Sequence, residues 1–467
     1  MLLVAILVLD LALAVAAARR PWVGLLVLLA TLPFNGIVSQ VVPGLVGTTP
    51  TATTALAAWH DALVAGIAAA AAADWLRSMR RPTWLETAIL AMLALGAVYV
   101  VVSPVRLTAV YAYRTLYEPA VLLLAITILA RTRGLPSRLV ATAATAFVST
   151  ATVAAVFTWL QVYSLGFHYL NVYYREPGQP LHWSYLATGL NQPRGIGTLT
   201  SPNEFGAVLA TALILLAVPN LVRWPGWVKT WLFVACALGL LLSFSRSGML
   251  STLVGLVVVG VLARDDWARV RRVRSLSIRQ RMSFISPLLV GLILTIYIFN
   301  TSGATTLVEA TVSGSEPSAQ CRPASVRQGV LTVLANPLGL GLGTAGPKAA
   351  RFGESASSSP ILTETWYLVY AIQVGIAGLG LLVATALLIL AGLWRSRASP
   401  ISRGVIALGL GLGAGALFIP IIDEPTVFTP LWAFGGLALA AGAVAADARG
   451  RIASQPVAST QPDPAPS

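Results

Sequence analysis

Long apolar runs recur along the whole chain, and short polar or basic segments separate them. A helix needs about 20 predominantly apolar residues to cross the hydrocarbon core of a bilayer. The pattern therefore predicts an all-α, polytopic integral membrane protein with about 12–13 transmembrane helices in a single domain over residues 1–452. The apolar runs lie near residues 2–18, 22–42, 56–74, 85–102, 109–130, 139–165, 203–222, 229–243, 248–263, 285–300, 361–392, 404–422 and 428–446.

Composition narrows the class of protein. Of the 467 residues, 57% are hydrophobic and only 10% are charged, whereas an average soluble domain carries about 25% charged residues. This difference excludes an ordinary soluble enzyme. The two cysteines and three histidines show no metal-ligand spacing and no disulfide framework. Neither a metal nor a cofactor is therefore expected.

The basic residues predict the orientation in the membrane. The chain has a net charge of +14. Most of its basic residues face the cytoplasm if the turn at Arg19 and Arg20 lies there and the spans alternate. The basic loop at about 264–284 is then cytoplasmic, where it faces anionic lipid rather than nucleic acid. Because the arginines follow the first run instead of preceding it, that run is predicted to be a retained span and not a signal peptide.

Two long loops, at about 166–202 and 301–360, then face the extracytoplasmic side. Long loops in a compact protein are usually either functional or disordered. The first loop is rich in aromatic residues. The second continues into SVRQGVLTVLANPLGLGLGTAG, which predicts an amphipathic helix, a proline break and a glycine-rich turn. The Pro-rich tail at 453–467 is predicted to be disordered.

Three arginines on the extracytoplasmic side depart from the positive-inside distribution. Arg194 ends the first long loop, Arg246 lies in the turn SFSRSG, and Arg327 lies in the second long loop. Each alone could anchor lipid headgroups or form an internal salt bridge. Together they favour a polyphosphate or pyrophosphate head at the outer leaflet, because guanidinium groups bind phosphate oxygens in bidentate fashion. Ser245 and Ser247 add hydroxyl donors at the start of a helix, a position that favours an anion.

Candidate proton acceptors lie in or beside the two long loops. Glu364, next to Trp366, could serve as a general base, or it could be a first-turn carboxylate that only stabilises its helix. His168 and His182 lie in the aromatic loop. Either histidine could act as a base or bind a sugar, and either could be a surface residue.

Ionisable residues within the spans are few. Arg114 and Glu118 are four residues apart, and this spacing predicts a mutual ion pair on one helix. His60 and Asp61, near the extracytoplasmic mouth of another span, are predicted to be similar. No arrangement typical of a proton relay is visible in the sequence.

Four segments in the second half of the chain carry a resemblance to a known family. They are RGIGTLTSPNEFGAVLA, with Arg194 and Asn203, the SFSRSG turn with Arg246, ANPLGLGLGTAG at 335–346, and ETWYLVYAIQVGIAGLGLL at 364–382. In this order and separation they resemble the O-antigen ligase and O-antigen polymerase superfamily of bacterial envelope glycosyltransferases.

The resemblance implies a fold of the GT-C type and a glycan donor carried on undecaprenyl pyrophosphate. The glycan would pass to an acceptor hydroxyl outside the inner membrane, without metal or nucleotide sugar. Arg194 and Arg246 match the family arginines that hold the pyrophosphate. The ligase branch has a histidine where this chain has Glu364, and this departure favours a polymerase or a ligase for another acceptor.

Other classes of function remain open from the sequence. They are a transporter or flippase for a polyprenyl lipid or glycolipid, a peptidoglycan-type polymerase of the SEDS class, and a non-enzymatic scaffold. A transporter would be expected to show inverted repeats with broken helices at the midplane, and no such pairing is visible. Convergence of Arg194, Arg246 and Glu364 on one outward cavity that opens sideways to lipid would favour the enzyme, whereas positions far apart on separate faces would exclude it.

Overall fold

A computed structural model describes residues 2–47, 50–174, 192–264, 278–302, 317–346, 363–419 and 424–453, together with positions 185, 305, 309, 313 and 349. These residues form helices and loops, without a β-strand. The helices are α1 (Leu2–Arg19), α2 (Pro21–Thr31), η1 (Leu32–Phe34), η2 (Ile37–Val41), α3 (Val42–Val46), α4 (Pro50–Ala57), α5 (Trp59–Ser78), α6 (Trp84–Val102), α7 (Arg106–Arg133), α8 (Leu139–Leu160), η3 (Gln161–Leu165), α9 (Gly166–Tyr173), α10 (Pro202–Ala217), α11 (Gly226–Ser243), α12 (Arg246–Leu262), α14 (Ile278–Ser302), α16 (Pro317–Ala335), α17 (Trp366–Arg395), α18 (Pro400–Ala416) and α19 (Pro425–Ala453).

The helices confirm an all-α, polytopic membrane protein. Within the described ranges, seven helices are long and apolar enough to cross a bilayer, and a bent pair over residues 21–46 makes up to eight. Four shorter apolar helices, in α10, α12, α14 and α18, accompany them. The tail predicted at 453–467 and most of the basic loop at 264–284 lie outside the described residues.

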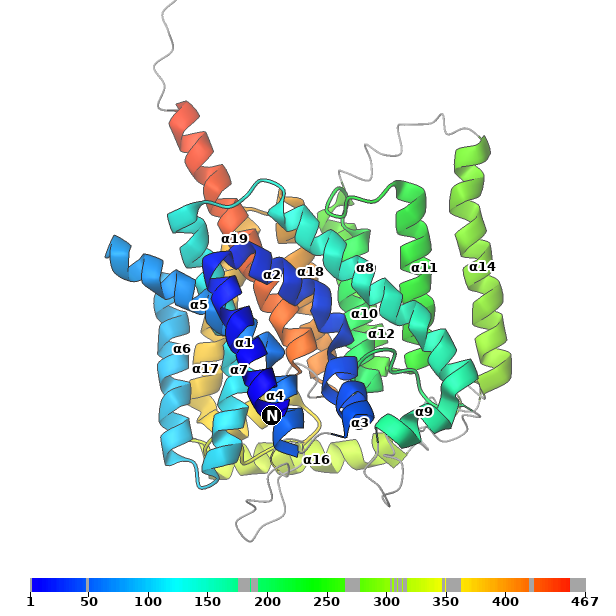
Figure 1. Cartoon of the computed structure of the whole chain (residues 1–467), viewed down its shortest axis with the longest axis horizontal. Coiled ribbons are helices and arrows are strands. Elements are labelled where there is room, and N and C mark those ends of the chain that lie inside the picture. Colours follow the sequence, from blue (N-terminus) through cyan, green and yellow to red (C-terminus); the bar gives the residue numbers. More distant parts are fainter. Residues whose placement is uncertain are drawn as a thin grey trace, which may run out of the picture.

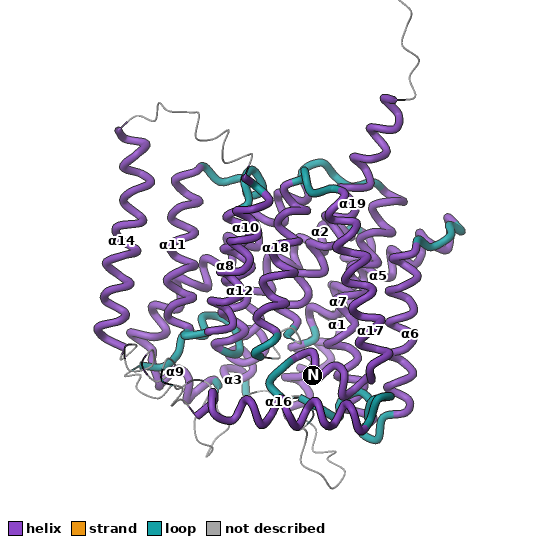
Figure 2. Tube along the Cα trace, turned by 180° about the vertical axis from the view of Figure 1, so that it is seen from behind, coloured by secondary structure: helices purple, strands orange, loops and turns teal. Residues whose placement is uncertain are grey.

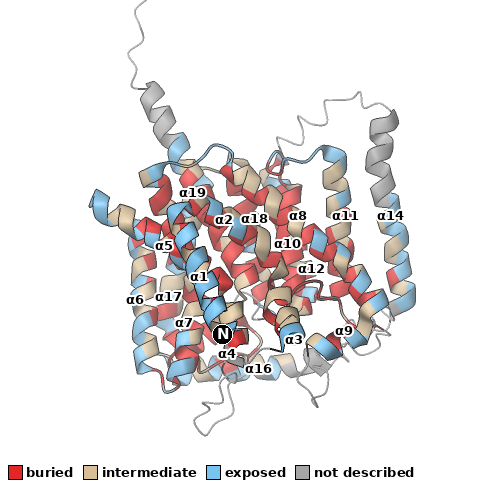
Figure 3. Ribbon diagram, viewed as in Figure 1, coloured by how far each residue is buried: buried red, intermediate tan, exposed pale blue. Residues whose placement is uncertain are grey.

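Burial separates an inner set of helices from an outer set. Helices α10 and α18 are buried over most of their length, whereas α1 and α14 expose large aliphatic side chains (Figure 3). In water such exposure would be costly, but lipid tails are as apolar as these side chains. The outer helices therefore have the surface expected of helices in contact with lipid.

Helix α16 runs across the ends of the upright helices instead of along them (Figures 1 and 2). It is the helix predicted before the glycine-rich turn of the second long loop, and it ends at Ala335. Helix α9 of the first long loop lies at the same end of the bundle. We call this the α16 end.

Two of the sequence segments that carried the family resemblance contact each other at the α16 end. Helix α17 kinks at Gly375, whose φ is 72° and ψ is 179°. The kink leaves the carbonyl groups of Ile372 and Gln373 to accept hydrogen bonds from the amides of Leu340 (2.8 Å) and Gly341 (3.0 Å) in the glycine-rich segment. The segment thus supplies the hydrogen bonds that a straight helix would make within itself.

We expect Gly375→Ala to destabilise the protein by about 3 kcal/mol, because this backbone region is essentially restricted to glycine. A Cβ atom at Gly375 would also lie 2.6 Å from the carbonyl carbon of Leu338. Thermal unfolding of the purified protein in detergent measures the effect. Gly380→Ala in the same helix is the matched control, since a Cβ there meets no atom within 4 Å. Equal unfolding temperatures for the two variants would contradict this account.

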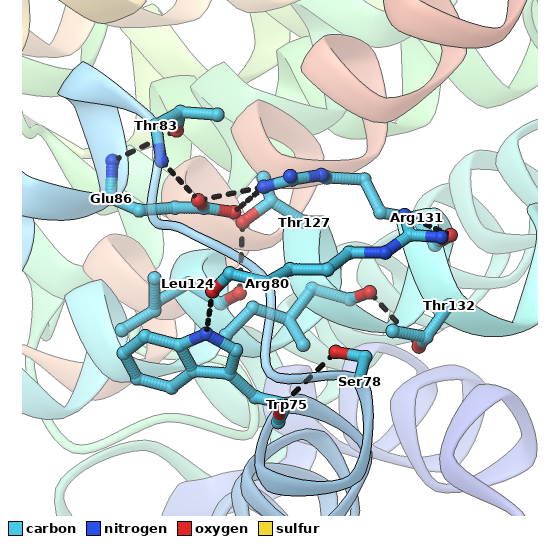
Figure 4. Close-up of polar contacts among 10 residues, drawn as sticks. Trp75, Ser78, Arg80, Thr83, Glu86, Leu124, Thr127, Arg131 and Thr132 are labelled. Carbon is cyan, nitrogen blue, oxygen red and sulfur yellow. Dashed lines mark hydrogen bonds and ion pairs between the residues drawn. The ribbon is translucent and has the colours of Figure 1, made fainter.

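An ion-pair cluster joins α6 and α7 at the opposite end of the bundle (Figure 4). Glu86 is buried, and both of its carboxylate oxygens lie 2.7 Å from Nη1 of Arg131. The same carboxylate accepts from the amide of Thr83, whose hydroxyl in turn accepts from the amide of Glu86. This capping box fixes the start of α6.

Arg131→Ala is expected to lower stability by about 2 kcal/mol, because it leaves a buried carboxylate without its charged partner. Thermal unfolding in detergent again measures the change. The double variant Glu86→Leu/Arg131→Met should recover much of the loss, since an apolar pair removes the buried charge altogether. A double variant less stable than Arg131→Ala would show that the ion pair itself is required.

The prediction of an ion pair between Arg114 and Glu118 is wrong. Arg114 instead pairs with Asp61 of α5, with Nε 2.7 Å from Oδ1 and Nη2 2.5 Å from Oδ2. The carboxylate of the neighbouring helix offers two oxygens to the guanidinium fork, and this bidentate geometry is stronger than a contact within one helix.

Candidate functional site

A tight turn between α11 and α12 forms the centre of the candidate site. Phe244 adopts a left-handed conformation with φ of 49° and reverses the chain after α11. The hydroxyl of Ser245 then accepts from the amide of Gly248 at 3.2 Å, so Ser245 is the N-cap of α12. Ser245 and Ser247 are both buried, with their hydroxyl oxygens 3.3 Å apart. The seryl hydroxyls proposed as ligand donors thus also build the turn.

Arg194 is anchored on this turn from a different part of the chain. Its Nε donates to the carbonyl of Ser243 at 2.9 Å, and its Nη2 donates to the carbonyl of Phe244 at 3.1 Å. Nη2 also lies 3.1 Å from Oδ1 of Asn203 in the first turn of α10. These three acceptors are uncharged oxygens, so the contacts fix the guanidinium group without an opposing carboxylate among them.

Arg246 begins α12 directly after the turn and is exposed. The amino end of this 17-residue helix carries a partial positive charge from the aligned peptide dipoles. Arg194, Arg246 and the helix end therefore concentrate positive charge around five consecutive residues, 243–247. Such an arrangement favours a ligand with several negative charges.

Glu364 forms an ion pair that the sequence analysis missed. Its Oε2 lies 2.7 Å from Nε of Arg322 on α16, and both side chains are partly exposed. The guanidinium carbon of Arg322 lies 5.7 Å from the ring centre of Phe418, just beyond α18. Glu364 is therefore a charge-paired carboxylate at the junction of α16, α17 and α18.

The end of α18 connects Glu364 to the turn at residues 243–247, which we call the arginine turn. The hydroxyl of Thr365 donates to the carbonyl of Leu417 at 3.0 Å. Two residues earlier, a Cβ at Gly415 would lie 3.1 Å from the carbonyl oxygen of Ser247. Glycine at this position thus lets α18 approach the first turn of α12 closely. Residues 415–418 hold the Glu364 region and the Arg246 turn together at the α16 end.

The other residues proposed from the sequence have different positions. Arg327 is exposed on α16, beside an open depression of about 520 Å³ along that helix. His168 is exposed on α9. His182 lies outside the described residues, so its role stays a prediction. Neither Arg327 nor His168 is connected to the arginine turn by the contacts given above.

Glu204 is a buried site residue that sequence reasoning missed. Its Oε2 accepts from the amide of Thr200 at 3.0 Å and from the same residue's hydroxyl. Its Oε1 accepts from the hydroxyl of Thr426 in the first turn of α19. Glu204 thus ties the loop that carries Arg194 to the bundle. The spacing of Ser201 and Glu204 at the start of a helix, typical of a capping box, was the available signal.

Tyr185 lies beside the same loop and remains protonated near neutral pH. Its carbonyl accepts from the amide of Arg194 at 3.0 Å, and its hydroxyl donates to the carbonyl of Thr200 at 2.7 Å. Burial, together with the negative charge of Glu204, raises the pKa of Tyr185 to about 12. Tyr185 is therefore a structural hydrogen-bond donor and not a base.

The fold and the site together define a class of protein. The chain is a multi-pass, all-α membrane protein in which Arg194 is bound to the turn that precedes Arg246, and Glu364 is paired with Arg322. Cationic side chains of this kind suit an anionic substrate rather than a metal ion.

A comparison with known families finds a match in the second half of the chain. Residues 231–383 match the family model described as O-antigen ligase. This match confirms the resemblance to the O-antigen ligase and polymerase superfamily. The match indicates a glycosyltransferase type of activity, with a lipid-linked glycan and an acceptor as the general classes of substrate. The matched segment includes Arg246, Arg327 and Glu364, whereas Arg194 precedes it. A comparison with curated proteins finds no match to the chain.

Proposed function

We propose that this protein transfers a glycan from undecaprenyl pyrophosphate to an acceptor hydroxyl at the extracytoplasmic face of the inner membrane. The reaction would serve polysaccharide biosynthesis in the cell envelope, as a ligase or a polymerase. The observation that carries the proposal is the anchoring of Arg194 on the carbonyls of residues 243 and 244, immediately before Arg246. It joins two arginines from separate loops at one helix amino end.

The proposed chemistry follows from the charges. The acceptor oxygen attacks the anomeric carbon of the donor, and the bond from that carbon to the phosphate oxygen breaks. The leaving pyrophosphate keeps the electron pair, so negative charge grows on its oxygen. Arg194, Arg246 and the amino end of α12 stabilise this charge where it develops. Direct displacement of this kind inverts the configuration at the anomeric carbon.

The proton of the acceptor hydroxyl passes to Glu364 in this proposal. A carboxylate can act as a general base when it lies within hydrogen-bond reach of the hydroxyl. The partner Arg322 holds the Glu364 carboxylate in one orientation through a 2.7 Å contact. Arg327, exposed on the same helix, would assist in holding the anionic donor, and His168 and His182 would contact sugar. No metal or cofactor takes part in this scheme.

A turnover assay tests the proposed function. The purified full-length protein in detergent is given a polyprenyl-pyrophosphate-linked oligosaccharide in the presence of chelator, and released polyprenyl pyrophosphate is measured. Release that requires the protein, together with a glycosylated product, is the expected result. The mass of the product separates polymerisation from transfer to a different acceptor. Tight binding of the donor without release for any acceptor would overturn the proposal and favour the transporter.

A further inference from the structure

A second cluster of ionisable side chains lies inside the bundle, between α5 and α7. It consists of His60 and Asp61 in the first turn of α5, and Arg114 and Glu118 of α7. Arg114 and Glu118 lie about 12–18 Å along α7 from Arg106, given a rise of 1.5 Å per residue. Ionisable groups at such membrane depth are costly and commonly mark a functional position.

The charges of the cluster do not balance when His60 is neutral. Arg114 engages both oxygens of Asp61, and the second carboxylate, Glu118, then carries one uncompensated negative charge. Oε1 of Glu118 is buried and has no hydrogen-bond partner among the described residues. A buried acceptor without a partner is rare and costly. The cluster therefore offers a cation both a net negative charge and an acceptor oxygen.

The spacing of three ligand atoms fits a shared metal ion. Nδ1 of His60 lies 3.3 Å from Oδ1 of Asp61 and 3.7 Å from Oε1 of Glu118. The second distance is too long for a hydrogen bond. A tetrahedral zinc ion with bonds of 2.0–2.1 Å separates its ligand atoms by about 3.3–3.4 Å. All three atoms lie within 4.8 Å of one another.

We propose that His60, Asp61 and Glu118 form a binding site for a divalent cation of the zinc class. One imidazole nitrogen and two carboxylate oxygens are a donor set that zinc accepts, whereas magnesium and calcium prefer oxygen alone. His60 is buried, whereas Asp61 and Arg114 are partly exposed, so the cluster reaches the protein surface on one side. The bound cation ties the first turn of α5 to α7. This site is separate from the arginine turn and does not depend on the glycan-transfer proposal.

Cobalt binding tests the site directly. The full-length protein, purified in detergent with an affinity tag that lacks histidine, is stripped with chelator and dialysed against Co²⁺. We expect about one Co²⁺ per chain, with the intense visible absorption of a four-coordinate ion. Glu118→Gln and His60→Asn should each weaken binding at least about 10-fold. His168→Asn, which removes an exposed imidazole from α9, is the matched control and should bind as the wild type does.

Two outcomes would overturn the proposal. They are a wild-type protein that binds no Co²⁺ or Zn²⁺ above background, and substituted proteins that bind as tightly as the wild type. If the substituted proteins fail to fold, the wild type still decides the question by thermal unfolding in detergent. Zn²⁺ should then raise its unfolding temperature, because a ligand that binds only the folded state stabilises that state. An unfolding temperature that does not change with Zn²⁺ would also reject the site.

Discussion

Arg246→Ala is expected to lower the rate of polyprenyl pyrophosphate release by about 10²–10³-fold, the usual cost of removing one donor that stabilises a developing oxyanion. The loss should appear mainly in kcat, because the charge on the leaving oxygen is largest in the transition state. Arg246→Lys should keep part of the activity, since it retains the charge but loses the bidentate fork. Steady-state release at several donor concentrations measures both variants.

Arg77→Ala is the matched control for Arg246→Ala. Arg77 is a strongly exposed arginine in the last turn of α5, and its nearest carboxylate, Asp74, is 4.0 Å away. This variant should transfer glycan at the wild-type rate. If Arg246→Ala changes only the apparent affinity for donor, Arg246 binds the ground state and does not stabilise the leaving group.

Glu364→Gln is expected to lower transfer by about 10²–10⁴-fold, the range that general base catalysis contributes. Glutamine keeps the size of the side chain and can still accept a hydrogen bond from Arg322, so the local structure is preserved. Single-turnover release with a saturating acceptor isolates the chemical step from product release. Activity of Glu364→Gln within a few fold of wild type would place the base elsewhere, with His168 and His182 the next residues to test.

A charge-reversal variant tests whether Glu364 acts as the base or only as a partner in the ion pair with Arg322. The double variant Arg322→Glu/Glu364→Arg restores opposite charges at positions 322 and 364 but moves the carboxylate from the segment before α17 to α16. If Glu364 is the base, this variant should fold, with an unfolding temperature near wild type, and remain inactive. If the ion pair alone matters, the reversal should rescue the activity that either single substitution removes.

The sequence predicted what depends on local pattern. Apolar runs of sufficient length predicted the all-α membrane fold, and the amphipathic run before Asn336 predicted α16. The turn around Arg246 could also be located, because Ser245 is a good N-cap and precedes a continuous apolar run. These features depend only on residues that are close together in the sequence, so they can be predicted from a single sequence.

Contacts between distant segments could not be predicted. Arg194 and the carbonyl of Ser243 are 49 residues apart, and Arg322 and Glu364 are 42 residues apart. The error at Arg114 has the same cause. Spacing along one helix favoured Glu118, whereas the fold brought Asp61 from α5 to the guanidinium group.

The kink at Gly375 has a consequence for how the chain inserts into the membrane. A backbone carbonyl facing hydrocarbon without a partner costs several kcal/mol, so the kinked half of α17 cannot be stable alone in lipid. The partners of Ile372 and Gln373 come from Leu340 and Gly341, which are synthesised earlier. The glycine-rich segment must therefore dock as α17 enters the bilayer. Insertion of α17 therefore depends on tertiary contacts as well as on partitioning into lipid. Substitutions in residues 336–343, which lie outside α17, should reduce the membrane insertion of α17.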